Sequence, residues 1–442
     1  MNRVSTVREK DKAVIMATVR RFGPISQVGI HDLTRIRPAT ISPLVRELLA
    51  SGKLNVVGHA DNPMGRKQVM LRINEESGYV VALDFDEEFV DVALLDLHPR
   101  VRRSLREPTN LASGIDGLLE QLFSCVERII PQSGLQAQSI QGIGVGVPGL
   151  VNPSTGTVMM SSTIEFWKQI ELKKLFETRF GISTVVENNS RTKAVAERVL
   201  GAGHMSEDMI YVEYGKGIGS GIIVGGKVLH GHSYSAGELG HTHVGADDRA
   251  CKCGSFGCLE AIAGISALER EVQSELRNGS QSALGKNGDE SHLDGWMVLK
   301  AARTGDKLCV AMVERLGHHL GLALANLVNL FNPSTIVLDS RLEAAGLQLL
   351  EQVSRVVRLQ ALKHATEGLV FRFGSLGSEV GVLGAGLLIT ERLFEVPLLK
   401  PPRFIIEHEA FSTRGSKGTA SRSVAARAGG TLASMPRAKL GT

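Results

Sequence analysis

Apolar residues recur at helical spacing through the first fifty positions of the chain. One side of a first helix is formed by Val14, Ile15, Val19 and Phe22. That helix should end at Gly23-Pro24, and Ser26 can cap a second helix over residues 27–34. Pro38 suits the first position of a third helix, because it lacks the N–H that would be unpaired there. The pattern predicts three short helices.

The third helix is followed by a strand pattern. The second helix has apolar positions at Val28, Ile30 and Leu33, and the third helix has residues at core spacing: Ile41, Val45, Leu48 and Leu49. Pro43 falls inside the third helix, where proline costs about 3 kcal/mol, so we expect a kink there or a start at Ser42. After Gly52, two apolar runs flank the turn-forming residues 62–65 and predict a hairpin within residues 55–75.

This N-terminal segment is strongly basic. Residues 1–75 carry 13 Lys/Arg and 6 Asp/Glu, a net charge of +7. Small polar residues and arginines near the start of the third helix suit a major-groove reader, and basic residues at a hairpin tip suit phosphate contacts. The candidate DNA-binding residues are Arg35, Arg37, Thr40, Ser42, Arg46, Arg66 and Lys67. A winged helix-turn-helix DNA-binding domain over residues 1–75 is favoured, with a small protein-binding or dimerising helical domain as the alternative.

The rest of the chain has a different pattern. From residue 79 to 396, β-branched runs alternate with helical stretches and glycine-rich turns, which predicts layered α/β structure. Residues 79–97 and 209–230 each begin with an apolar strand pair joined by a turn, which suggests two similar lobes. Residues 401–442 lack periodicity and carry seven Lys/Arg against two Asp/Glu, so we expect a disordered basic tail.

Composition excludes several classes of protein. With 43% apolar and 22% charged residues, the chain can build large cores and is not broadly disordered. No apolar run reaches the roughly 18 residues of a membrane span, and the N-terminus lacks the apolar stretch of a secretory signal. The total net charge of +4 leaves −8 for residues 76–400. We therefore expect a cytoplasmic protein without a membrane partner, whose basic end meets a polyanion.

Three of the five cysteines lie within eight residues. The spacing His241-x9-Cys251-x-Cys253-x4-Cys258 offers three thiolates and one imidazole, which close a tetrahedral Zn²⁺ shell with no position left for water. The sequence therefore predicts a structural zinc ion, with His243 as a rival fourth ligand. Two carboxylates, Glu238 and Glu260, flank this loop and could accept hydrogen bonds from vicinal hydroxyls of a sugar; ordinary surface salt bridges are the alternative.

Two glycine-rich turns invite comparison with phosphate loops. Gly144-x-Gly146-x-x-Gly149 formally matches a dinucleotide fingerprint, but the residues that follow it do not begin a helix. The alternating glycines from Gly215 to Gly221 lie between two strand patterns. Their backbone N–H groups could hold a phosphate, or the hairpin could need glycines for its own packing.

Four segments resemble the signature segments of the ROK family, named for repressors, open reading frames and sugar kinases. They are GVPGLVNPSTGTV (146–158), AGELGHTHV (236–244), CKCGSFGCLEAIAG (251–264) and LFNPSTIVLDS (330–340). Together with the basic N-terminal segment, they make residues 10–395 similar to the repressor branch of that family, which includes the xylose, N-acetylglucosamine and glucose-uptake repressors.

The resemblance implies a fold class and a site. The fold is α/β: a winged helix-turn-helix, then a two-lobe, actin-like, sugar-kinase-like body over residues 78–400. The lobes would be residues 78–195 plus 380–400, and residues 196–379. A sugar would bind in the cleft between them, and the implied sugar ligands are Asn188, Glu238, His241 and Glu260, with His241 shared by the zinc ion.

Departures from the kinase pattern argue against catalysis. Family kinases follow an Asp with a Gly-Gly-Thr phosphate loop, whereas here Asp84 is followed by Phe85-Asp86-Glu87-Glu88, without glycine and with carboxylates that would repel phosphates. The kinases' catalytic Asp is replaced by Asn189, and loss of a general base typically lowers a rate by about 10²–10⁴-fold. We therefore expect no catalytic residues. Thr163 stands near the place of a sugar-binding Asn of the family, which suggests a changed ligand.

These features together predict a sugar-responsive, DNA-binding transcriptional regulator, a repressor of carbohydrate uptake or metabolism genes rather than an enzyme. Its expected partners are double-stranded operator DNA, a small sugar effector and further copies of itself in a homodimer or homotetramer. Sugar binding would close the cleft and alter the spacing of two DNA-binding heads. Two alternatives stay open: an active ROK-type sugar kinase with a DNA-binding extension, and a DNA-binding protein without a small-molecule ligand.

Overall fold

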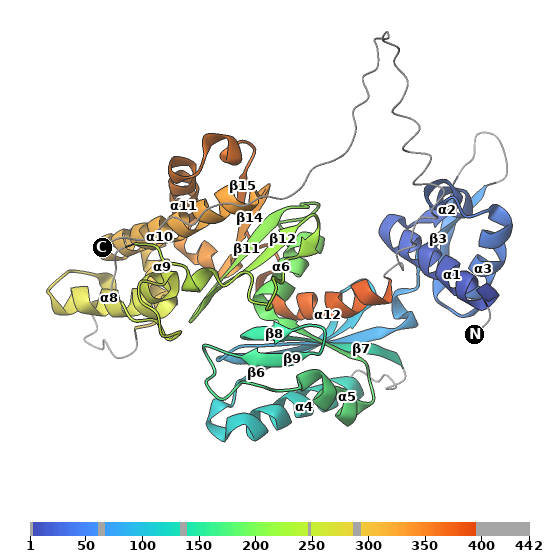
Figure 1. Ribbon diagram of the computed structural model, residues 1–442, viewed down its shortest axis with the longest axis horizontal. Helices are drawn as coiled ribbons and strands as arrows, with labels where there is room; N and C mark the ends of the chain where they lie inside the picture. The colour runs from blue at the N-terminus through green and yellow to red at the C-terminus, as the bar shows by residue number, and fades with distance from the viewer. Residues whose placement is uncertain (1–2, 61–66, 133–138, 246–248, 286–292, 395–442) are drawn as a thin grey trace, which may run out of the picture. The chain divides into compact units, whose positions relative to one another are not determined.

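The computed structural model describes residues 3–60, 67–132, 139–245, 249–285 and 293–394 (Figure 1). The predicted hairpin turn at 62–65, Arg66 and the predicted tail at 401–442 lie outside the described residues.

The N-terminal head, residues 3–73, consists of three helices and a small antiparallel sheet of order β1-β3-β2. Its elements are α1 (Arg3–Phe22), β1 (Ile25–Ser26), α2 (Gln27–Thr34), α3 (Pro38–Ala50), β2 (Leu54–Ala60) and β3 (Gln68–Ile73). The head has its own apolar core, which includes Ile15, Val19, Ile30, Ile41, Leu44, Val45, Leu48 and Leu71.

The predicted helix ends agree with the structure, but part of the apolar pattern lies outside the core. The Ser26 hydroxyl accepts a hydrogen bond from the Gly29 N–H at 3.1 Å, and Pro38 occupies the start of α3. Phe22, Val28 and Leu33, which belong to the apolar pattern of the first two helices, are about half exposed and lie outside the head's core. The start at Ser42 is also wrong: α3 runs through Pro43, because the buried apolar side of the helix offsets one missing backbone hydrogen bond.

Two five-stranded sheets form the body, and their topology is the same. The first has the order β10-β7-β4-β5-β6 and the second β13-β12-β11-β14-β15. In each sheet, the first strand in sequence lies at the centre, antiparallel to the second and parallel to the fourth. The strands are β4 (Tyr79–Phe85), β5 (Phe89–Asp96), β6 (Val101–Pro108), β7 (Ile140–Val147), β10 (Thr184–Asn188), β11 (Met209–Tyr214), β12 (Ile218–Val224), β13 (Lys227–Val228), β14 (Thr335–Leu338) and β15 (Val370–Phe373).

Helices cover these sheets. The first lobe, built on the first sheet, carries α4 (Gly114–Gln132), α5 (Leu172–Phe180), α6 (Asn189–Val199) and α12 (Val380–Leu393), with the short strands β8 (Leu150–Asn152) and β9 (Thr157–Met160). The second lobe carries α7 (Leu259–Ala263), α8 (Ile265–Arg277), α9 (Gly295–Arg303), α10 (Lys307–Phe331) and α11 (Leu347–Gln360). Short 3-10 turns are η1 (Glu75–Ser77), η2 (Leu111–Ser113), η4 (Leu239–His241), η5 (Ala283–Gly285), η7 (Ser340–Ala345), η8 (Lys363–Thr366) and η9 (Gly377–Glu379).

The glycine-rich stretches serve helix packing. A Cβ on Gly144 would lie 1.9 Å from the Ala385 carbonyl oxygen of α12, and one on Gly219 would lie 2.2 Å from the Ser190 hydroxyl of α6. Strand β7 is followed by strand β8 rather than by a helix, so the formal dinucleotide fingerprint has no structural counterpart. Only glycine allows such close approach of helix and strand.

α10 is the single helix in the described part of the chain that is long and apolar enough to cross a membrane. It is a core helix of the second lobe, because Leu316, Leu320, Leu324 and Val328 are buried there. α11 packs closely along it, and a Cβ on Gly321 would lie 2.5 Å from the Val356 Cβ.

The last described helix joins the body to the head. α12 lies across the sheet of the first lobe (Figure 1), and its C-terminal end reaches the head, where Phe394 packs into the head's core. Arg20 of α1 donates to the Thr390 carbonyl at 3.0 Å and pairs with Glu391 at 2.8 Å. Its guanidinium also lies 4.8 Å from the centre of the Phe394 ring.

Candidate functional site

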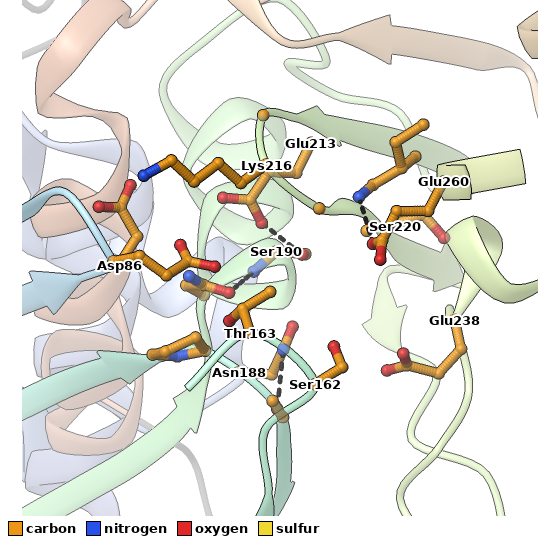
Figure 2. A pocket seen from close by; sticks show the side chains of 18 of the residues that line it. Asp86, Ser162, Thr163, Asn188, Ser190, Glu213, Lys216, Ser220, Glu238 and Glu260 are labelled. Atoms are coloured by element: carbon orange, nitrogen blue, oxygen red, sulfur yellow. Dashed lines mark hydrogen bonds between the residues drawn. The ribbon is translucent and has the colours of Figure 1, made fainter. Parts of the chain in front are cut away.

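A cleft lies where the two lobes face each other (Figure 2). Its walls come from the β4–β5 turn, the segments after β7 and β9, the start of α6, the β11–β12 turn, and the segments around η4 and α7. The lining residues with polar side chains are Asp86, Glu87, Glu88, Ser162, Thr163, Asn188, Asn189, Ser190, Glu213, Lys216, Ser220, Glu238, His241, Glu260, Trp296 and Arg341. All four residues implied as sugar ligands are among them.

Two of these four are held firmly by the backbone. Asn188 caps α6: its carbonyl oxygen accepts from the Arg191 N–H at 3.2 Å, and its amide donates to the Gly149 carbonyl at 2.9 Å. Glu260 accepts from the Ile218 N–H at 3.0 Å. Each side chain still has hydrogen-bonding capacity for a ligand, since an amide has four positions and a carboxylate about as many.

His241 connects the cleft to the cysteine loop. Its Nδ1 is 3.6 Å from the Cys251 sulfur, whereas its Nε2 is 3.9 Å from Glu238 Oε2. Glu238 is 40% exposed in its side chain, and burial among these groups raises its pKa. The two ring nitrogens of His241 therefore face different groups: Nδ1 faces the Cys251 sulfur, and Nε2 faces the Glu238 carboxylate in the cleft.

The cysteine loop brings together the donors of a metal site. The ligand atoms of His241, Cys251, Cys253 and Cys258 all lie within 4.8 Å of one another. A tetrahedral zinc ion with the usual bond lengths has S–S edges of about 3.8 Å and S–N edges of about 3.6 Å. The Cys253–Cys258 sulfur distance of 3.8 Å and the Cys251–His241 distance of 3.6 Å fit these edges.

His243, the rival fourth ligand, does not belong to this group. Its Nε2 lies 3.4 Å from the Ser255 hydroxyl, outside the set of donors that converge. Three thiols and one imidazole suit a metal such as zinc, and the set leaves no open position on a four-coordinate ion.

The β4–β5 turn closes on itself. Asp86 accepts hydrogen bonds from the N–H groups of Glu88 at 2.7 Å and Phe89 at 2.9 Å. These N–H groups are consequently unavailable to a phosphate. From the opposite lobe, Lys216 pairs with Glu88 at 3.4 Å across the cleft, and Figure 2 shows its side chain extending toward Asp86.

A buried ion network lies beneath this turn, and the sequence reading missed it. Lys193 of α6 pairs with Glu213 and lies 3.6 Å from Asp84, while the Ser190 hydroxyl donates to Glu213. Burial raises the pKa of Asp84 to about 7, against the opposing effect of Lys193. Burial also disfavours the charge on Lys193, but the two carboxylates outweigh it and raise its pKa. The one available signal in the sequence was the lysine in the first turns of α6.

Asn189, which the family resemblance places at the position of the kinases' catalytic Asp, carries a carboxamide rather than a carboxylate. Asn189 is 6% exposed, and its side-chain carbonyl accepts from the Ser190 N–H at 3.0 Å. A carboxamide does not take up a proton near neutral pH, so it cannot act as the general base of phosphoryl transfer.

In the head, the candidate DNA-binding residues gather around the start of α3. Arg35, Arg37 and Arg46 are exposed, and Thr40 and Ser42 are half-buried in the first turns. Arg35 sits in a left-handed conformation with φ of 59° between α2 and α3. Lys67 is exposed before β3, whereas Arg66 lies outside the described residues. Within the described chain no ion pair involves Arg35, Arg37 or Arg46, whereas Glu47 of the same helix pairs with Arg8 and Lys12 of α1.

Comparisons with known proteins agree with this architecture. Residues 90–392 match the ROK family. The chain is 27% identical to a putative xylose repressor of Caldicellulosiruptor sp. (strain Rt8B.4) over 397 residues, 90% of this chain and 99% of that protein. It is 30% identical to the DNA-binding transcriptional dual regulator NagC of Escherichia coli (strain K12) over 363 residues, 81% of this chain and 87% of NagC.

A solved structure supports the same fold. It is described as a ROK family transcriptional regulator, a homolog of the E. coli MLC protein, and it aligns with a TM-score of 0.76 and 24% identity, covering 88% of this chain and 97% of that one. The matches extend beyond the kinase-like body and include most of the length of these regulators. The chain belongs to the ROK family.

Proposed function

We propose that this protein is a sugar-responsive, DNA-binding transcriptional repressor of carbohydrate uptake or metabolism genes that has no kinase activity. One contrast carries the proposal: the cleft keeps Asn188, Glu238, His241 and Glu260, while Asn189 and a carboxylate-rich turn replace the phosphoryl-transfer machinery. The two relatives that this chain matches over most of their length are named as a putative xylose repressor and a DNA-binding transcriptional dual regulator.

The head, residues 1–75, acts as a winged helix-turn-helix. α3 enters the major groove, with Thr40 and Ser42 toward base edges and the flanking arginines on phosphates, and the β2–β3 wing adds Arg66 and Lys67. The exposure of Arg35, Arg37 and Arg46 supports this arrangement. Because DNA is the partner, the protein works in the cytoplasm.

The body, residues 78–400, senses the sugar. A structural zinc ion held by His241 Nδ1, Cys251, Cys253 and Cys258 crosslinks the loop that carries the sugar ligands. His241 Nε2, Glu238 and Glu260 then bind hydroxyls of the sugar, and Asn188 binds from the first lobe. Because these ligands come from both lobes, the sugar favours the closed cleft.

Two copies of the chain read one operator. A homodimer, or a homotetramer built from dimers, presents two heads to two half-sites, and their spacing decides affinity. α12 offers the route from cleft to head: its first turn abuts Asp84, and its last turn binds Arg20. A shift between lobes would thus reach the head.

The proposal is tested by DNA binding to the intergenic region upstream of the chain's own gene, measured across a salt series with and without a sugar panel. Arg37→Ala and Arg46→Ala should each weaken binding about 5- to 100-fold and lower the salt slope by about one unit. Arg355→Ala, which removes an arginine of α11, is the matched control. Operator binding that is unchanged by both head variants and by every sugar would refute the proposal.

A further inference from the structure

Arg191 reaches from α6 to the segment that leads into Glu238. Its Nη2 donates hydrogen bonds to the carbonyl oxygens of Tyr234 at 2.6 Å and Ala236 at 2.9 Å. Arg191 is 2% exposed, so these two bonds lie away from solvent. A charged donor makes stronger hydrogen bonds than a neutral one, and a planar guanidinium holds its acceptors in a fixed geometry. The guanidinium thus fixes two carbonyl groups within the four residues before Glu238.

The guanidinium is itself held by Glu187. Arg191 Nη1 donates to Glu187 Oε1 at 3.2 Å, and Glu187 is 5% exposed. The other carboxylate oxygen, Oε2, lies 2.7 Å from His230 Nε2. His230 belongs to the same segment, since the Ala236 N–H donates to its carbonyl oxygen at 3.1 Å. One buried carboxylate therefore joins the arginine of α6 to the beginning of the segment.

The segment has a backbone conformation that needs support. Tyr234 lies in the left-handed region with φ of 61°, which a residue with a bulky side chain rarely adopts. Gly231 and Gly237, on either side, also have positive φ, of 75° and 94°. Such a conformation persists where the surrounding contacts determine it, and it is typical of binding sites. The hydrogen bonds from Arg191 are contacts of this kind.

Glu238 depends on this backbone for its place in the cleft. Its carboxylate lies 3.9 Å from His241 Nε2, too far for a hydrogen bond, and among the described residues no hydrogen bond holds it. Figure 2 shows the side chain pointing toward Ser162 of the first lobe. The carbonyl of the preceding Gly237, by contrast, accepts from the Ser220 N–H at 3.0 Å and from the Ser220 hydroxyl at 2.8 Å. The backbone before Glu238 therefore decides where its carboxylate lies.

The same helix start carries the sugar ligand of the first lobe. Asn188 caps α6, and its side-chain carbonyl accepts from the Arg191 N–H at 3.2 Å. Arg191 itself is not among the described residues that line the cleft. The first turn of α6 thus presents one side chain to the cleft and uses another to hold the segment of the second lobe.

We infer that Arg191 is a positioning residue for sugar binding, which sets Glu238 of the second lobe at a fixed place relative to Asn188 of the first. Glu187 and His230 hold the arginine and the segment together. The inference rests on the proposed sugar-sensing function and adds to it the residue that aligns ligands from the two lobes. Arg191 acts on the sugar through Glu238, without touching the sugar.

The test is calorimetry on the full-length protein with D-glucose, N-acetyl-D-glucosamine and D-xylose, continued with the sugar that binds the wild type most tightly. Arg191→Lys keeps the charge beside Glu187 but loses the planar fork, so it should weaken sugar binding about tenfold or more. Arg198→Lys is the matched control, because Arg198 of the same helix donates to the Ser206 carbonyl at 3.0 Å, outside the cleft lining. The control should change affinity less than about twofold. Wild-type affinity in Arg191→Lys overturns the inference.

A double-mutant cycle separates positioning from a general loss of structure. If Arg191 acts through Glu238, then Arg191→Lys should weaken sugar binding less than about threefold in a Glu238→Gln background, against about tenfold in the wild type. Equal losses in the two backgrounds would show that Arg191 supports the fold rather than the place of Glu238, and would overturn the inference.

A second variant covers the case in which Arg191→Lys lowers the melting temperature by more than about 5 °C. His230→Ala then takes its place in the cycle, because the His230 side chain is 33% exposed and leaves Arg191 paired with Glu187. It should weaken sugar binding about threefold in the wild type and not in Glu238→Gln. Equal losses again overturn the inference and leave sugar sensing standing. If no sugar of the panel binds the wild type or changes its operator affinity, the sugar-sensing function is refuted and the inference with it.

Discussion

The two lobes repeat one topology but carry opposite chemistry at equivalent turns. The β4–β5 turn holds three consecutive carboxylates, Asp86 to Glu88, and its N–H groups bond to its own Asp86 side chain. The β11–β12 turn contains Gly215 and Gly217 and opens toward Glu260. The repeat shows that apolar periodicity sets the sheet order, whereas a few turn residues set what each lobe can bind.

The largest difference between the lobes is the cysteine loop, which belongs to the second lobe alone in the described chain. Cys258→Ser should abolish metal binding by this cluster and remove most of the stability of this loop, because a structural zinc ion contributes an apparent 10–16 kcal/mol, roughly, in small zinc domains. We expect loss of the sugar response together with loss of metal, measured by metal analysis and calorimetry. Cys125→Ser changes a buried thiol of the first lobe and should keep the metal. A full equivalent of zinc in Cys258→Ser would contradict the assignment.

The buried ion network connects the two lobes, because Lys193 lies between Asp84 of the first lobe and Glu213 of the second. Lys193→Met removes the cation between Asp84 and Glu213 and should lower the free energy of unfolding by about 3–5 kcal/mol, since breaking a buried pair strands its partners. Urea unfolding measures this change. Lys174→Met, on an exposed lysine, should change stability by less than about 1 kcal/mol. Equal stability of the two variants would show that the network is not buried in solution.

Asp84 adds a pH dependence to the first lobe. Its pKa of about 7 in the folded protein exceeds the usual value, so the folded state binds more protons between about pH 4 and pH 7. Stability from this group is therefore present at low pH and is lost as pH rises toward 7, by up to about 4 kcal/mol. Asp84→Asn should flatten that part of the profile in unfolding experiments at several pH values. If the unfolding free energy of Asp84→Asn depends on pH as steeply as that of the wild type, other groups cause the dependence.

The contact between α12 and the head is a weaker link. A double-mutant cycle of Arg20→Ala and Glu391→Gln should give a coupling energy of about 0.5–1 kcal/mol, because the pair is only partly buried. The same variants should reduce the effect of sugar on operator affinity, with affinity in the absence of sugar changed only a few-fold. An undiminished sugar effect would place the coupling elsewhere.

The smallest expected effect concerns catalysis. Asn189→Asp restores a carboxylate at the position of the kinases' base, yet ATP consumption with the sugar panel should remain at background. The β4–β5 turn would still repel phosphates, and Lys193 would still pair with Glu213. Turnover by this single variant would show that the turn is no barrier to ATP and would weaken the contrast between the lobes.

Local patterns predicted much of this molecule. The capping Ser26, the start at Pro38, the strand pairs at 79–97 and 209–230, and the choice of the ROK family are confirmed. The convergence of His241 with the three cysteines also agrees with their spacing. The caps, strand pairs and His/Cys cluster involve residues that are close in the chain. Their separation along the chain therefore limits how far apart they can lie in the fold.

Other features depended on distant segments. Local sequence was enough to predict the element types, the cysteine loop and the carboxamide of Asn189. The exposure of Phe22 and the place of Pro43 inside α3 became known from the folded chain. The same holds for the pairing of Lys193 with Asp84 and Glu213 and for the contact of α12 with Arg20. These partners are brought together by the packing of α6 and α12 against two sheets, and no local periodicity encodes which side chains then meet across more than a hundred residues.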